Sequence, residues 1–254
     1  MGVLPYGSQS MSDKLKFSVM YLAIATVVLL VAVTVIYSLW YPFPLLLATG
    51  TQKLLQTIAL VNIGLAVGLA LMVFRKTKAD FIKDMVISAL VQLIFLMISI
   101  YGVYQIRPIW IAYNVDRFEL ILHTDLVTTK INDADNRFKK PSYLSPQYVG
   151  VELSADNEER NSNMFDEVLH GISIAQRPER YIPIEQVSTQ IKERAQDLVL
   201  LEKYNNKNDV QSLLKKYPQA DSFVPLQAKA VNMTVLLKKS EDNQVVAIVD
   251  LRPW

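Results

Sequence analysis

The sequence predicts an α-helical membrane domain of three transmembrane helices followed by an α+β soluble domain. Within the first 106 of the 254 residues lie three long runs without a charged side chain, whereas acidic and amide residues crowd the remainder. In that remainder, β-rich segments are followed by amphipathic ones and then by β-rich segments again. We therefore divide the chain into an N-terminal tail at residues 1–16, a membrane domain at 17–106 and a soluble domain at 107–254.

The three uncharged runs, at residues 17–40, 54–74 and 85–105, are each long enough to cross roughly 30 Å of hydrocarbon as a helix. The first run could instead be a cleaved signal peptide, because Lys14 and Lys16 precede it. However, its apolar core is longer than that of a signal peptide, and two further spans follow. We interpret it as a retained span, with Met11 as an alternative start of the chain.

Lysine and arginine near the span ends indicate on which side each loop lies. The basic residues of the tail and of the linker between the second and third spans are Lys14, Lys16, Arg75, Lys76, Lys78 and Lys83. The linker between the first two spans has only Lys53. These residues predict a cytoplasmic N-terminus. Three crossings then place the soluble domain outside, which at a bacterial inner membrane is the periplasm.

Aromatic residues near the predicted outer ends of the spans fit the belts found at membrane interfaces. They are Tyr37, Trp40, Tyr41, Tyr101, Tyr104 and Trp110. We expect Arg107 to lie among the lipid headgroups, and we expect the third span to end at Pro108, which cannot continue a helix.

The soluble domain is predicted to begin with a β-hairpin, because residues 109–114 and 117–123 are rich in β-branched and aromatic side chains around a Val-Asp turn. Helices are predicted at residues 156–170, 185–204 and 209–217. Two late strands, at residues 228–238 and 244–251, flank a Ser-Glu-Asp-Asn turn.

The sequence offers little for catalysis or metal binding. The absence of cysteine excludes thiol chemistry, and the two histidines, His123 and His170, lack the spacing of metal ligands. No nucleotide-binding loop or nucleophile elbow occurs, and a net charge of +2 gives no case for nucleic-acid binding. A Ser-His-Asp site depends on geometry that the sequence does not give. We predict a protein that is not an enzyme and has no cofactor.

The polar and small residues inside the spans give the most information about function. Asn62 and Gln92 lie near the middle of their spans, where an amide without a hydrogen-bond partner is costly. They either bond to each other, or one faces a groove and bonds to another protein's transmembrane helix. Gly64 and Gly68 form a G-x-x-x-G pair that allows close helix approach, either within the chain or to a partner.

The order and spacing of several segments resemble the type IV pilin accessory proteins, the TfpX/TfpZ family. The segments are WYPFPL (40–45), VNIGLAVGLALMVF (61–74), KDMVISALVQL (83–93), YGVYQIRP (101–108), DRF (116–118) and VAIVDLRPW (246–254). The chain departs from that family at Asn62, where the family tends to have an acid, and at Ala66-Val67, where the family tends to have Gly-Pro. A role of position 62 that needs a charge is therefore not expected here.

The resemblance implies an inner-membrane chaperone that helps a cognate type IV pilin subunit to be stabilised and assembled. Its expected partners are the transmembrane helix and globular head of the major pilin, within membrane lipids. The candidate contacts are Asn62, Gly64, Gly68 and Gln92 in the spans, and Arg117 and Phe118 in the soluble domain. The alternatives are a membrane-bound sensor and a pilin-modifying enzyme that resembles a glycosyltransferase.

Overall fold

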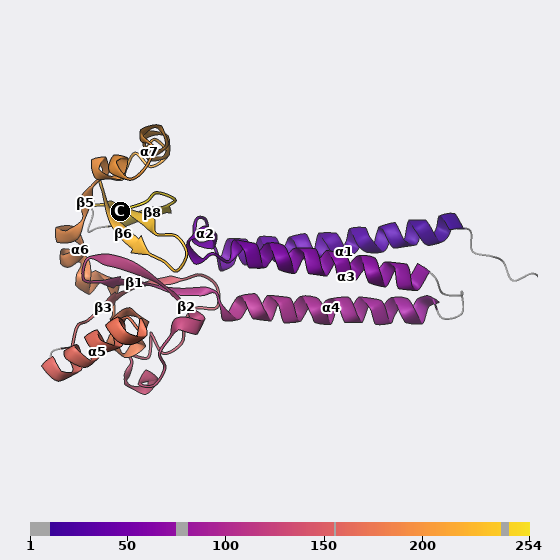
Figure 1. Ribbon diagram of the computed structural model, residues 1–254, viewed down its shortest axis with the longest axis horizontal. Coiled ribbons are helices and arrows are strands. Elements are labelled where there is room, and N and C mark those ends of the chain that lie inside the picture. Colours follow the sequence, from indigo (N-terminus) through magenta and orange to yellow (C-terminus); the bar gives the residue numbers. More distant parts are fainter. Residues whose placement is uncertain (1–10, 75–80, 155, 240–243) are drawn as a thin grey trace, which may run out of the picture. The chain divides into compact units, whose positions relative to one another are not determined.

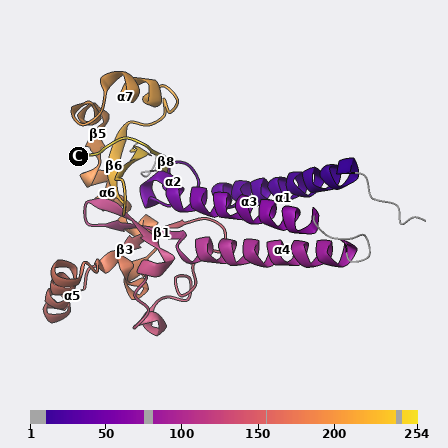
Figure 2. The ribbon, with the colours of Figure 1, turned by 45° about the vertical axis from the view of Figure 1, so that its right-hand side comes forward.

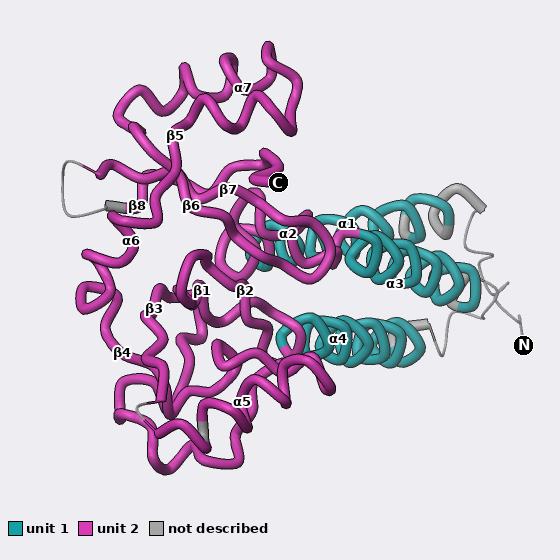
Figure 3. Tube along the Cα trace, turned by 60° about the vertical axis from the view of Figure 1, so that its left-hand side comes forward, with its two compact units in different colours: residues 1–36, 53–104 teal, residues 37–52, 105–254 magenta. Residues whose placement is uncertain are grey.

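Figure 1 shows the computed structural model, which describes residues 11–74, 81–154, 156–239 and 244–254. It confirms the predicted fold class of membrane helices followed by an α+β domain. The chain forms two compact units (Figure 3). The helical unit comprises Met1–Ile36 and Lys53–Tyr104, and the sheet unit comprises Tyr37–Gln52 and Gln105–Trp254.

The helical unit is built from α1 (Met11–Leu39), α3 (Gln52–Phe74) and α4 (Phe81–Gln105). Within them, Ser18–Leu39, Gln52–Met72 and Lys83–Gln105 are long and apolar enough to cross a membrane. The protein is therefore a membrane protein. Three of the basic residues used to predict its orientation, Arg75, Lys76 and Lys78, lie outside the described residues.

The sheet unit contains an eight-stranded mixed sheet in the order β4-β3-β1-β2-β6-β7-β8, with β5 paired to β6. The strands are β1 (Pro108–Asn114), β2 (Arg117–Leu122), β3 (Gln147–Val151), β4 (Tyr181–Ile182), β5 (Gln196–Asp197), β6 (Ser222–Gln227), β7 (Met233–Lys238) and β8 (Gln244–Val249). The pairs β1–β3 and β2–β6 are parallel, and the other pairs are antiparallel. The predicted hairpin of β1 and β2 is confirmed at the centre of the sheet.

Both faces of the sheet are covered. Side chains of α2 (Leu45–Thr49) and α6 (Ser188–Arg194) join one apolar cluster, to which β1, β2, β6 and β7 contribute alternate residues such as Ile111 and Val224. A second cluster includes Trp110 and Ala112 on the opposite side of β1. A third joins α7 (Lys207–Leu214) to the β6–β8 part of the sheet. Because each face has its own apolar layer, the central strands are buried on both sides.

The predicted helices were only partly correct. The helix α5 (Asn157–His170) confirms the first, with Asp156 capping its start and Gly171 in the left-handed conformation at its end. The helix predicted at residues 185–204 is wrong, since only α6 is α-helical there. Extended Ala195 ends α6, and Gln196–Asp197 then pairs with β6, so sheet pairing overrides the helical pattern.

The remaining elements also differ from the prediction. The last helix, α7, begins earlier, at Lys207, because the Asn206 side chain accepts the Asn208 N–H at its start. Strands β3 and β6 were not predicted. The late strands are confirmed as β7 and β8, while the Ser-Glu-Asp-Asn turn at 240–243 lies outside the described residues.

The loop between the first two spans is part of the sheet unit. Leu45 and Ala48 of α2 are buried in the first apolar cluster. The carbonyl of Ala48 accepts the N–H groups of Ala230 and Val231 at 3.0 and 3.3 Å. Gly50 ends α2 with a φ of 73°, and a Cβ at this position would lie 2.9 Å from the Cβ of Ala230. Glycine is therefore required both for the backbone conformation and for the close approach.

The expected positions of three residues at the membrane exit are wrong. Arg107 is 1% exposed and donates to the Ser142 carbonyl at 3.2 Å, so it does not lie among headgroups. Tyr41 is fully buried, and Trp110 packs edge-on against Phe138 and Tyr181 in the second cluster, so neither belongs to an interfacial belt. Interfacial belts and domain cores both use aromatic residues, and hydropathy does not separate the two where a span runs directly into a domain.

Candidate partner-binding site

A largely apolar groove of about 520 Å³ lies among the three helices of the helical unit. Residues of α1, including Ala25, and of α4, including Ala89, line it together with Asn62 of α3. Gln92 of α4 also lines it, so both predicted amides meet at one site. A groove of this kind, inside helices that cross a membrane, is accessible to lipid tails or to another helix.

The two amides are bonded to each other and to their own helices. Asn62 is 1% exposed, and its Nδ2 donates to the Ile58 carbonyl at 2.9 Å and to the Ser99 Oγ at 3.3 Å. Gln92 Nε2 donates to the backbone carbonyl and the Oδ1 of Asn62, at 3.3 and 3.5 Å. These bonds join α3 to α4, which is the first of the two readings of the sequence.

Among the described residues, one hydrogen-bond acceptor of the Asn62 and Gln92 amides has no donor. Gln92 Oε1 is buried and has no hydrogen-bond donor within the described part of the chain. An unpaired amide oxygen in hydrocarbon is unfavourable, because no water is there to replace a protein donor. Gln92 therefore supports the first reading through its nitrogen, while its buried oxygen has no donor among the described residues and belongs to a residue that lines the groove.

The glycine pair lies on the other side of α3. Asn62, Ala66 and Ala70 are buried and face the rest of the helical unit. Gly64 and Gly68 are exposed, and a Cβ at either would have no described atom within 4 Å. Residues two apart on a helix point in roughly opposite directions, so one straight partner helix cannot contact both the groove and the glycines.

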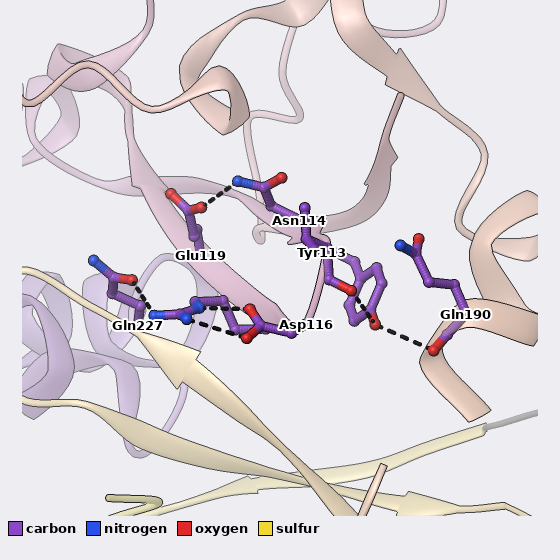
Figure 4. A network of polar contacts seen from close by, with 8 residues as sticks. Tyr113, Asn114, Asp116, Glu119, Gln190 and Gln227 are labelled. Atoms are coloured by element: carbon purple, nitrogen blue, oxygen red, sulfur yellow. Dashed lines mark hydrogen bonds and ion pairs between the residues drawn. The ribbon is translucent and has the colours of Figure 1, made fainter. Parts of the chain in front are cut away.

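The structure places Arg117 and Phe118 differently from each other. Figure 4 shows Asp116 and Gln227, the two residues that Arg117 contacts. Arg117 is held by Asp116, with Nε to Oδ1 at 2.8 Å, and by Gln227 Oε1 at 3.4 Å. Its hydrogen bond to Asp116 lowers the pKa of that carboxyl group. Phe118 is fully buried and packs edge-on against Tyr113, so it supports the core instead of facing a partner.

A second hollow, of about 540 Å³, lies beside β2 and was not predicted. Three acidic residues, Glu119, Asp125 and Glu167, line it with Lys229, whose Nζ lies 3.5 Å from Asp125 Oδ1. Glu119 Oε1 accepts from Asn114 Nδ2 at 2.8 Å (Figure 4). Burial raises the pKa of Glu119, and the bond from Asn114 opposes that shift. In the sequence, Glu119 is only a polar residue within a predicted strand, and nothing there indicates that it lines a hollow.

Glu119→Gln is expected to stabilise the sheet unit at neutral pH. The pKa of Glu119 is raised above 4.5 on folding, so the folded state binds the proton more tightly and wild-type stability falls as the pH rises through that range. Glutamine keeps an acceptor for Asn114 and removes the buried charge. Urea unfolding of the full chain in detergent, from pH 4 to pH 8, should show the gain shrinking toward pH 4. Glu158→Gln on the exposed face of α5 is the control, and an equal gain in both variants would contradict the prediction.

Within the described residues, no group of three or more histidine, aspartate or glutamate side chains is placed to hold a metal ion.

Two proteins of Dichelobacter nodosus are similar to this chain over most of its length. The fimbrial assembly protein of serogroup E1 is 24% identical over 244 residues, which cover 92% of this chain and 95% of that protein. The fimbrial assembly protein of serogroup I is 23% identical over 225 residues, which cover 85% and 87%. No protein-family model matches the chain, and no solved structure matches it significantly. The similarity therefore extends over both the membrane helices and the sheet unit, to proteins named for the assembly of fimbriae.

Proposed function

We propose that this protein is an inner-membrane accessory protein that binds and stabilises a cognate type IV pilin subunit and promotes pilus assembly. The names of the two relatives support a role in fimbrial assembly. The single observation that carries the binding role is the groove with the unpaired Gln92 Oε1. The proposal includes no catalytic step and no cofactor.

In this proposal, the groove receives the single transmembrane helix of the pilin before assembly. The apolar walls supply packing, and the Gln92 side chain turns its buried, unpaired Oε1 toward a donor on the pilin helix when that helix enters the groove. Such a bond inside a membrane contributes about 1 kcal/mol. A single bond of this size adds selectivity without preventing release, which suits an accessory protein because the pilin must be held and then released to the growing fibre.

The proposed orientation follows from the positive-inside rule, with the N-terminus cytoplasmic and the sheet unit in the periplasm. The pilin head would then be on the same side as the sheet unit. Asn62 acts indirectly in this scheme, because it positions Gln92 through the bonds between α3 and α4. Gly64 and Gly68 offer a separate face for close helix approach.

Deleting the gene tests the function. We expect the amount of major pilin to fall and surface pili to be lost, and a plasmid copy of the wild-type chain to restore both. Normal pilin amount and normal piliation in the deletion strain would refute the proposal.

Site-specific photo-crosslinking tests the groove directly. A photoreactive residue at Ala89, which lines the groove, should capture pilin in living cells. The same residue at Ala23, which is exposed on α1 outside the groove, is the matched control and should capture much less. Equal capture at both positions would count against the groove as the binding site.

A further inference from the structure

Helix α5 has its polar face turned inward and its apolar face turned outward. Asn163 is buried and Asp166 is half-buried. Four large apolar side chains, Met164, Phe165, Val168 and Leu169, are all more than half exposed. They form two adjacent pairs at a spacing of four residues, so they share one face. A helix that packs on a core has the opposite arrangement.

Polar contacts fix this orientation. Asp166 Oδ2 lies 2.5 Å from Arg177 Nη2, and the guanidinium of Arg160 donates to the Ser154 carbonyl at 2.9 Å. Asp156 caps the first turn by accepting the Glu158 N–H at 3.1 Å. None of the three apolar clusters of the sheet unit includes a residue of α5. The helix lies at the edge of the sheet unit in Figures 1 and 2, with α7 at the opposite edge.

An apolar helix face left in water marks an interaction surface, because four neighbouring large side chains gain free energy when a partner covers them. The charges around this face select the partner. Glu158, Glu167 and one basic residue, Arg160, are exposed on the same helix, and the Arg160 guanidinium is bonded to the Ser154 carbonyl. Glu167 also lines the hollow that contains Glu119, Asp125 and Lys229. The surface is therefore an apolar stripe whose border is acidic on balance, with two exposed carboxylates, Glu158 and Glu167, and one guanidinium that is held by a backbone carbonyl.

The acidic border disfavours two other occupants. In a symmetric pair of α5 helices the acidic borders of two copies would face each other, and like charges across an interface are repelled. An anionic lipid surface attracts basic segments and repels acidic ones. A protein surface with apolar side chains bordered by lysine or arginine has the complementary chemistry.

We propose that the outward face of α5 is the docking surface for the outer domain of the pilin subunit, which meets it through an apolar patch bordered by basic side chains. This inference rests on the proposed function and adds a second contact, outside the membrane, to the groove. Two linked contacts on one partner strengthen binding because the second forms at a high effective concentration.

Val168 and Val199 provide a matched pair for the test, since they are 77% and 71% exposed and only Val168 lies on the α5 face. Photoreactive residues at these positions of the full-length protein in living cells should capture pilin at Val168 and not at Val199. Val168→Glu should lower pilin capture from a photoreactive residue at Leu169 about tenfold, as loss of a central interface contact does. Val199→Glu should leave it unchanged.

Capture from Ala89 separates this inference from the proposed function. Pilin captured at Ala89 but not at Val168 would overturn the α5 inference and leave the groove in place. No pilin at either position would overturn both. Capture at Val168 of a second copy of the chain, or of lipid alone, would also overturn the inference, in favour of a dimer face or a membrane contact.

Discussion

Replacing Leu45 by alanine is expected to lower the free energy of unfolding of the sheet unit by about 2–5 kcal/mol, the usual cost of truncating a buried leucine. Leu45 lies between the first two membrane spans in sequence, yet its side chain is 2% exposed within the first apolar cluster. Urea unfolding of the full chain in detergent, followed by tryptophan fluorescence, measures the change, because Trp110 is buried in this unit.

Phe43→Ala is the control for Leu45→Ala. Phe43 lies two residues away in the same loop and is 62% exposed, so its truncation should change the unfolding midpoint little. If the two variants unfolded at the same urea concentration, the packing of α2 would not contribute to the stability of the sheet unit.

Filling the groove with Ala89→Phe is expected to reduce pilin amount and surface pili by about tenfold or more, because a bulky side chain would occupy the space of the incoming helix. Ala89 is exposed on α4 and lines the groove, so the new ring need not disturb the bonds of Asn62 and Gln92. Immunoblots of pilin and counts of pili on cells carrying the variant in place of the wild-type gene measure the effect.

Ala23→Phe makes the same substitution on an exposed position of α1 that does not line the groove. We expect normal pilin amount and normal piliation in this strain. The amount of the accessory protein itself should be similar in both strains. Full piliation with Ala89→Phe would mean that the groove is not where a partner helix binds.

The membrane part of the fold could be predicted because hydrocarbon thickness imposes a length on each uncharged run. The hairpin of β1 and β2 and the capped helix α5 were also predictable, since turn and cap residues act locally. The prediction of a helix at residues 185–204 was wrong because β5 pairs with β6, and nothing within those residues indicates that β6 will be their neighbour. The packing of α2 in the sheet unit could not be predicted for the same reason, because its hydrogen-bond partners, Ala230 and Val231, are far away in sequence.

The candidate site was predictable in its residues but not in its geometry. A polar side chain within a span is conspicuous, so Asn62 and Gln92 could be named from sequence alone. Which amide faces inward depends on how the helices are rotated, and so does the separation of Gly64 and Gly68 from the groove. The outward apolar face of α5 follows from Asp166 and Arg177 meeting on its inner side, a pairing that a helical pattern does not show.

The insertion of α2 into the sheet unit has a consequence for biogenesis. The carbonyl of Ala48 bonds to the N–H of Ala230, which is synthesised about 180 residues later. At a translation rate of roughly 5–20 residues per second, α2 waits on the order of 10–40 s before strands β6 and β7, the neighbours of that bond, emerge. Throughout that interval the apolar side of α2 has no sheet to cover it, so the nascent chain passes through a stage at which a general chaperone or a protease can reach it.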